Sequence, residues 1–237
     1  VAVLGASETF GLYETEGKEY PRQLEALLQE RFGEGVQVVS IGFAGQSVGQ
    51  ALLRLDENLR DVDPALLVVY PSLAAYINAP DGEWKLGRQA PRPPFGGSRI
   101  AQRVRDLLKQ VLPPAVQTAL RAWQSDLAYS EDEVWSRLPQ ENVDKFESDI
   151  NALVEQARGH GVEVGLATHA TLFGDSVEPE ERSHLVDWRK FFPILAEDAF
   201  LDMERRLNDI IRETAREQGL ILVEVANKMK PGTENFV

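Results

Sequence analysis

The residue best placed to do chemistry in this sequence is Ser7, which follows the first apolar run, Val1–Leu4, almost directly. The segment around it is Gly5-Ala6-Ser7-Glu8-Thr9-Phe10-Gly11. A serine next to glycine, on a tight turn from a strand into a helix, presents its hydroxyl at the edge of a sheet. Helix amides at such a turn can stabilise an oxyanion. This segment alone fits a nucleophile and a structural turn serine equally well.

The residues around Ser7 exclude the two common nucleotide-binding loops. They have neither the G-x-G-x-x-G spacing of a dinucleotide loop nor the Gly-Lys-Ser/Thr of a phosphate loop. A second glycine-rich turn ends the second apolar run and leads into a helix with a capping box. It is Ser40-Ile41-Gly42-Phe43-Ala44-Gly45-Gln46-Ser47.

Together, the two turns resemble blocks I and II of the SGNH hydrolases, also called GDSL-type esterases and lipases. The nucleophile turn of that family is Gly-Asp-Ser-x-Thr-x-Gly, often with a small residue for Asp, and Ala6 stands at that place. The second block, Asn-x-Gly-x-x-Gly, matches with Ser40 in place of Asn, and the Tyr20-Pro21 pair is also typical. The resemblance implies that Ser7 is the nucleophile and that the amides of Ser7 and Gly42 are oxyanion donors.

The third block of the family departs from this pattern. It is Gly-x-Asn-Asp, and its Asn side chain is the third oxyanion donor. Here the third apolar run continues as Tyr70-Pro71-Ser72-Leu73-Ala74-Ala75-Tyr76, so the Asn position falls on Ala74, which cannot donate. Loss of one such donor typically costs about 10²–10³ in rate. Asn78 is a candidate pocket residue that could replace it only if its loop folds back.

The last family block, Asp-x-x-His, follows the fifth strand and supplies the general base with its orienting carboxylate. The sequence stops at Val237, about where this Asp should begin, and it opens at Val1 inside a strand-like run. We therefore expect that the sequence is trimmed at both ends and that an Asp-x-x-His lies just past Val237. A longer sequence without it would contradict an active hydrolase.

The three histidines within the sequence offer other candidates for a base. His160 is expected to be solvated in a turn at the amino edge of the sheet, and His184 to be exposed in a polar segment. His169 follows the fourth apolar run, at the carboxyl edge. It either lines the pocket or is hydrogen-bonded beneath the next loop. Histidines scattered without matching carboxylate spacing predict no metal site.

The elements that must position these residues are short apolar runs alternating with amphipathic segments. The pattern predicts a three-layer α/β/α, doubly wound fold with a five-stranded, mainly parallel sheet. The family resemblance implies the flavodoxin-like arrangement of SGNH hydrolases. The strands are predicted at 1–4, 36–41, 66–70, 162–167 and 220–225. Helical stripes are predicted at 20–28, 48–59 (with the capping box of Ser47 and Gln50), 143–154 and 203–211.

Residues 78–140 break this rhythm and are interpreted as a helical insertion after the third strand, in a single SGNH hydrolase-like domain over 1–237. The insertion contains a predicted helix at 100–111 and carries Trp84, Trp123 and Trp135. It is either a lid over the ligand edge of the sheet or a helical excursion with its own small core. The aromatic segment 186–192 likewise either lines a groove or packs in the core.

Composition narrows the possible partners of the 237-residue chain. A net charge of −13 argues against general affinity for nucleic acid or anionic membranes, and the absence of cysteine excludes thiolate catalysis and disulfides. No apolar run approaches the ~20 residues of a membrane span. Neither the compartment nor the oligomeric state is indicated.

The sequence thus predicts a serine hydrolase that acts on a carboxylic ester, either a short acyl ester or an acetylated carbohydrate. It would form an acyl-enzyme on Ser7 and need no cofactor or metal. One alternative is an O-acetyltransferase, which passes the acyl group to a sugar hydroxyl. Another is a non-catalytic domain of the same fold that binds a glycan or a protein. Ala74 favours this last alternative, whereas the retained Ser7 turn argues against it.

Overall fold

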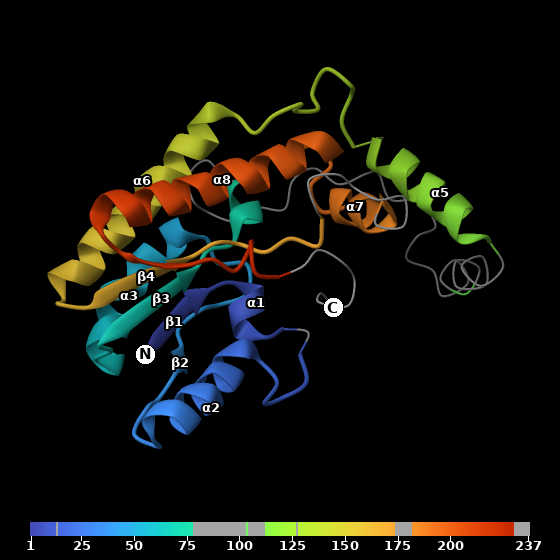
Figure 1. The fold of residues 1–237 in the computed structure, drawn as a ribbon. Coiled ribbons are helices and arrows are strands. Elements are labelled where there is room, and N and C mark those ends of the chain that lie inside the picture. The colour runs from blue at the N-terminus through green and yellow to red at the C-terminus, as the bar shows by residue number, and fades with distance from the viewer. Residues whose placement is uncertain (13, 78–102, 104–111, 127, 174–181, 230–237) are drawn as a thin grey trace.

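The fold is built on one parallel sheet of five strands, in the order β2-β1-β3-β4-β5 (Figure 1). The computed structural model describes the chain except residues 13, 78–102, 104–111, 127, 174–181 and 230–237. The strands are β1 (Ala2–Gly5), β2 (Val39–Ser40), β3 (Leu66–Tyr70), β4 (Glu163–Ala167) and β5 (Ile221–Val223). All five predicted strands are confirmed, and the sheet, predicted to be mainly parallel, is parallel throughout.

The register of the central strands brings their carboxyl ends to one edge. Gly5 pairs with Tyr70, and Val69 of the same strand pairs with Leu166. The chain segments that follow β1, β3 and β4 therefore leave the sheet side by side. This edge is where ligands bind in open α/β sheets.

Helices lie on both sides of the sheet. In Figure 1, α2 (Tyr20–Phe32) lies below it, whereas α6 (Gln140–Gly159) and α8 (Glu197–Gln218) lie above it. Right-handed crossovers explain why α2 lies on the opposite face from α6 and α8. The chain crosses the sheet in one direction from β1 to β2 and in the other direction in all later connections. The other helices are α1 (Ser7–Phe10), α3 (Val48–Val62), the 3₁₀ helix η1 (Leu73–Tyr76), α5 (Pro114–Asp126) and α7 (Arg182–Arg189).

The main core lies between the sheet and α3, α6 and α8. The predicted helical stripes supply it, with Leu55, Phe146, Leu153 and Leu207 all fully buried. Burial of each such side chain stabilises the fold by about 1.5–3 kcal/mol. The predicted capping box is present at the start of α3, where the side chains of Ser47 and Gln50 each accept a backbone N–H at 3.1 Å.

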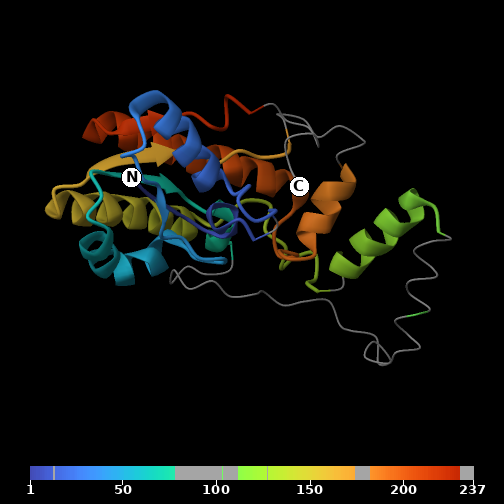
Figure 2. The same cartoon turned by 90° about the horizontal axis from the view of Figure 1, so that it is seen from below.

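Two further helices, α5 and α7, lie beyond the carboxyl edge in both views (Figures 1 and 2). They are joined by an ion pair of 3.1 Å between Arg189 and Asp126. The helix α5 belongs to the predicted insertion, and its Trp123 is 59% exposed. The helix predicted at 100–111, Trp84 and Asn78 lie outside the described residues.

The aromatic segment before α8 packs mainly inward. Trp188 lies 4.9 Å from Phe192 and 3.8 Å from Phe200, measured between ring centroids, whereas Phe191 is 58% exposed. Core packing is thus confirmed for Trp188 and Phe192. Over the described part of the chain, no helix combines the length and apolar character that a membrane crossing needs.

Candidate active site

Two glycines allow the first two turns of the sheet edge to lie against each other. A Cβ on Gly42 would lie 2.5 Å from the carbonyl oxygen of Gly5. A Cβ on Gly5 would in turn collide with Oγ1 of Thr9 and lie 2.7 Å from the carbonyl oxygen of Tyr70. Backbone therefore packs on backbone at this point, which explains why both positions carry glycine. The contact brings the turn that carries Ser7 next to the turn that carries Gly42.

Ser7 is the first residue of the short helix α1 and is half-buried. Its N–H belongs to the first turn, where helix donors have no partner within the helix. Its hydroxyl donates to Oε2 of Glu8 at 3.3 Å. The turn is tied to its surroundings through buried Thr9, whose Oγ1 lies 2.8 Å from the Tyr20 hydroxyl and whose carbonyl accepts from Ser40 Oγ at 3.5 Å.

His169 lies at the carboxyl end of β4, as predicted, and helix α8 holds it from two sides. Its Nδ1 is 2.9 Å from Oε2 of Glu204, a residue only 4% exposed. One turn further along α8, Asn208 accepts from the His169 backbone N–H at 2.7 Å and donates to its carbonyl at 2.9 Å. The ring of Tyr70 stacks on the imidazole at 5.3 Å. Backbone and ring of His169 are thus both fixed.

The second ring nitrogen of His169 points to the Ser7 turn. Its Nε2 is 4.0 Å from Oε1 of Glu8, the residue whose other oxygen accepts the hydroxyl of Ser7. Ser7, Glu8, His169 and Glu204 therefore form a continuous row of polar contacts, which we call the Ser7 row. It links the ends of β1 and β4 to α8.

Charge interactions within the Ser7 row shift two pKa values. Burial alone would lower the pKa of the His169 imidazole, but the carboxylate of Glu204 outweighs this and raises it well above its usual value. Burial would likewise raise the pKa of the Glu8 carboxyl, but the hydrogen bond and the charge of His169 lower it below its usual value. Both shifts favour an imidazolium form of His169 between two carboxylates.

The other predicted candidates lie apart from this row. His160 is bonded to Asp56 at 2.8 Å, at the amino edge, and His184 is exposed as predicted. Ala74 lies in η1 and is half-buried against the core. Among the described residues, no group of three His, Cys, Asp or Glu side chains could hold a metal ion.

Glu8, Glu204 and Asn208 were not predicted as site residues from the sequence. Glu8 stands at the variable position of the nucleophile motif, so the motif gives it no role. Glu204 and Asn208 do carry a signal, because they are adjacent to Met203 and Leu207 of the apolar stripe at the same spacing of four. Two polar residues one turn apart on the buried face of a helix indicate a buried polar partner.

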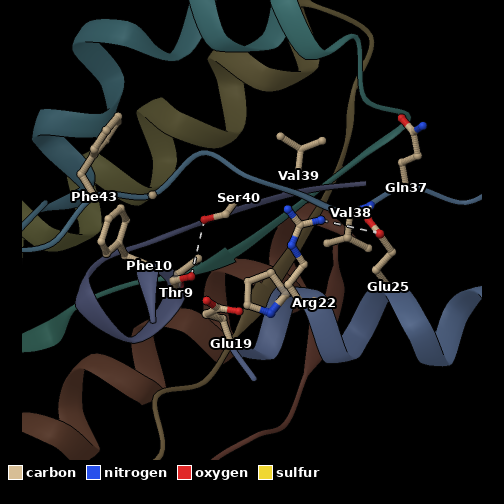
Figure 3. A pocket seen from close by; sticks show the side chains of 12 residues that line it. Thr9, Phe10, Glu19, Arg22, Glu25, Gln37, Val38, Val39, Ser40 and Phe43 are labelled. Carbon is tan, nitrogen blue, oxygen red and sulfur yellow. Dashed lines mark hydrogen bonds and ion pairs between the residues drawn. The ribbon is translucent and has the colours of Figure 1, made fainter. Parts of the chain in front are cut away.

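A groove of about 560 Å³ lies on the α2 side of the Ser7 turn (Figure 3). Phe10 and Phe43 lie at one end, and Arg22 and Glu25 lie toward the other. Neither Ser7 nor His169 lines it, but Gly42 does. The full lining is Thr9, Phe10, Glu19, Pro21, Arg22, Glu25, Gln37, Val38, Val39, Ser40, Gly42 and Phe43. The groove therefore adjoins the Ser7 row without containing it.

Comparison with known proteins assigns the fold. An acetyl xylan esterase has a TM-score of 0.54 at 14% identity, over 96% of this chain and 79% of its own. An alpha/beta hydrolase enzyme from the metagenome of Lake Arreo, Spain, has a TM-score of 0.50 at 16% identity, over 95% of this chain and 76% of its own. A GDSL-like lipase from Bacteroides thetaiotaomicron has a TM-score of 0.49 at 14% identity, over 96% of this chain and 69% of its own. No family model and no curated protein matches the sequence. The likeness to the acetyl xylan esterase shows that the chain has the SGNH-hydrolase fold.

Proposed function

We propose that this protein is a serine hydrolase that cleaves a carboxylic ester through an acyl-enzyme on Ser7. The observation that carries the proposal is the interlocked pair of glycine turns at the carboxyl edge, in a fold shared with esterases. The half-buried Ser7 stands at the head of a helix on one turn, and Gly42 on the other turn packs against Gly5. This is an arrangement suited to acyl transfer.

In the proposed reaction, Oγ of Ser7 attacks the acyl carbonyl carbon while a general base takes the hydroxyl proton. The amides of Ser7 and Gly42 stabilise the negative oxygen of the tetrahedral intermediate. Collapse of the intermediate expels the alcohol, which receives the proton, and leaves the acyl group on Ser7. Water then attacks the acyl-enzyme, releasing the acid and restoring the hydroxyl. The family resemblance assigns the base to a histidine after the fifth strand.

The groove beside Gly42 supports an ester whose alcohol part is a carbohydrate or another polar molecule. It combines two exposed rings, Phe10 and Phe43, with the charged side chains of Glu19, Arg22 and Glu25. Aromatic faces next to hydrogen-bonding groups suit a sugar ring, which has both apolar faces and hydroxyls. The proposed acyl group is short, such as acetyl, and water releases it from Ser7 as the acid. With a sugar hydroxyl in place of water, the same acyl-enzyme would make an O-acetyltransferase.

One observation favours a second candidate, a binding domain that has kept the fold but lost the reaction. Ala74 occupies the position of the third oxyanion donor, and its methyl side chain cannot donate a hydrogen bond. A glycan or a protein would then bind at the carboxyl edge without being cleaved. The proposed hydrolase and this domain differ in whether Ser7 is activated.

Reaction with a fluorophosphonate probe distinguishes these two functions, because the probe labels activated serines only. We expect the full-length protein to be labelled covalently and Ser7→Ala to lose the label completely. Ser130→Ala is a matched control, since this serine lies in an exposed turn, and it should be labelled like the wild type. A folded wild type that stays unlabelled would favour the binding domain.

A further inference from the structure

We propose that His169 is a positioning residue for Ser7 and that it acts through Glu8. This inference rests on the proposed function, because a positioned hydroxyl matters only if Ser7 reacts. In this view, α8 fixes the imidazole, the imidazole holds the carboxylate of Glu8, and Glu8 orients the hydroxyl of Ser7. Each link corresponds to one set of contacts in the Ser7 row.

The first link is the fixed ring of His169. Glu204 accepts from Nδ1, Asn208 clamps the backbone, and Tyr70 covers one face of the imidazole. The Tyr70 ring is itself held, since its hydroxyl accepts from the backbone N–H of Ala170 at 3.1 Å and Tyr20 packs edge-on against it at 6.1 Å. With Nδ1 occupied, the direction of Nε2 is determined, and it faces Glu8.

The second link is the restraint on Glu8. Its side chain is 45% exposed, so without a partner it would sample several rotamers. The imidazolium 4.0 Å away favours the one in which Oε1 faces the ring. Glu204 also attracts the imidazolium, but it binds Nδ1 and so leaves Nε2, on the side of the Ser7 turn, to Glu8. Within the described residues, the charged or titratable groups that face the imidazole are Glu8 from α1, Glu204 from α8 and Tyr70 from β3.

The third link is the hydroxyl of Ser7. It donates to Oε2 of Glu8, so the position of this carboxylate decides where the hydroxyl proton points. A nucleophile that is misplaced by about 1 Å loses about 10²-fold in rate. A restrained Glu8 thus keeps Oγ in one orientation before a substrate arrives. His169 therefore positions Ser7 indirectly, because in the Ser7 row the imidazole contacts Glu8 and not Oγ of Ser7.

The test is a double-mutant cycle on the rate constant of fluorophosphonate labelling, measured per folded molecule. Glu8→Gln and His169→Gln should each lower the rate about 10-fold to 10²-fold. The double variant should be no slower than the slower single variant, because His169 acts through Glu8. His160→Gln is the matched control, since His160 pairs with Asp56 at the opposite edge, and its rate should equal that of the wild type.

Three results would overturn the inference while the proposed function survives. One is a His169→Gln variant that reacts like the wild type. Another is a double variant whose loss is the product of the two single losses, which indicates independent roles. The third is a loss in His169→Gln as complete as in Ser7→Ala, which indicates a general base. A wild type that does not react at all overturns the proposed function and the inference together.

A second readout avoids any substitution in the core. The pKa of the His169 ring can be followed by NMR in the wild type and in Glu8→Gln, which alters only a partly exposed side chain. Removal of the Glu8 charge should lower the pKa of His169, because one of the carboxylates that favour the imidazolium is lost. An unchanged pKa would show that the two residues do not pair, and would overturn the inference.

Discussion

Two carboxylates are buried to the same extent in this protein, and their surroundings differ in one respect. Asp149 on α6 and Glu204 on α8 are both 4% exposed. Asp149 accepts from the Tyr76 hydroxyl at 2.8 Å and pairs with Lys145 on its own helix. The same hydroxyl accepts from the Gly49 N–H at 3.4 Å. All members of this network lie on α3, η1 and α6.

Glu204 instead binds a partner that has a second polar end. His169 uses Nδ1 for Glu204 and presents Nε2 to Glu8, on the turn that carries Ser7. Burial of a carboxylate therefore does not by itself distinguish a structural network from a candidate site. The distinction depends on what the partner of the carboxylate contacts in turn. For Asp149 the contacts end at the Gly49 N–H of α3, and for Glu204 they lead on to the turn that carries Ser7.

The largest expected effect concerns the closed network. Asp149→Ala removes the acceptor of the Tyr76 hydroxyl and the partner of Lys145, which should lower the free energy of unfolding by about 3 kcal/mol. Urea unfolding measures this change. Labelling of Ser7 per folded molecule should stay at the wild-type rate. Glu147→Ala, at an exposed site of the same helix, is the control, and a comparable loss there would contradict a special role of Asp149.

A smaller effect should appear in the pH dependence of stability. The pKa of His169 is raised in the folded protein, so its contribution is complete below the unfolded value of about 6.5 and is lost as pH rises through the folded value. The wild type should therefore lose up to about 1.4 kcal/mol per pH unit above pH 6.5, relative to His169→Gln. Urea unfolding at several pH values provides the measurement. Parallel curves for the two proteins would contradict the charged pair.

A third comparison concerns one tyrosine hydroxyl in each network. Tyr76→Phe leaves the buried Asp149 short of a donor and should cost about 1–3 kcal/mol of unfolding free energy. Tyr70→Phe removes only the acceptor for the Ala170 N–H and should cost about 1 kcal/mol. Thermal unfolding of the two variants compares them directly. Equal losses would mean that the two networks are equally sensitive to a missing hydroxyl.

The sequence alone determined the five strands, the main helices and the turn that carries Ser7. Strands and helices followed from apolar runs and from stripes of period 3.6, because both patterns are local and the burial of one face enforces them. The capping box of Ser47 and Gln50 was likewise predictable, since its partners are three residues apart. Ser7, Gly42 and His169 could be assigned to the carboxyl edge because parallel strands end there together.

Only the tertiary structure decided which side chains meet at that edge. His169 and Glu204 are 35 positions apart, and their contact depends on how α8 is rotated over the sheet. Glu8 joins them because β1 and β4 both pair with β3, which brings the ends of the two strands close. Such contacts follow from strand order and helix orientation, and the packing of the whole core determines both. A motif of seven residues could therefore locate Ser7 but could not identify its neighbours.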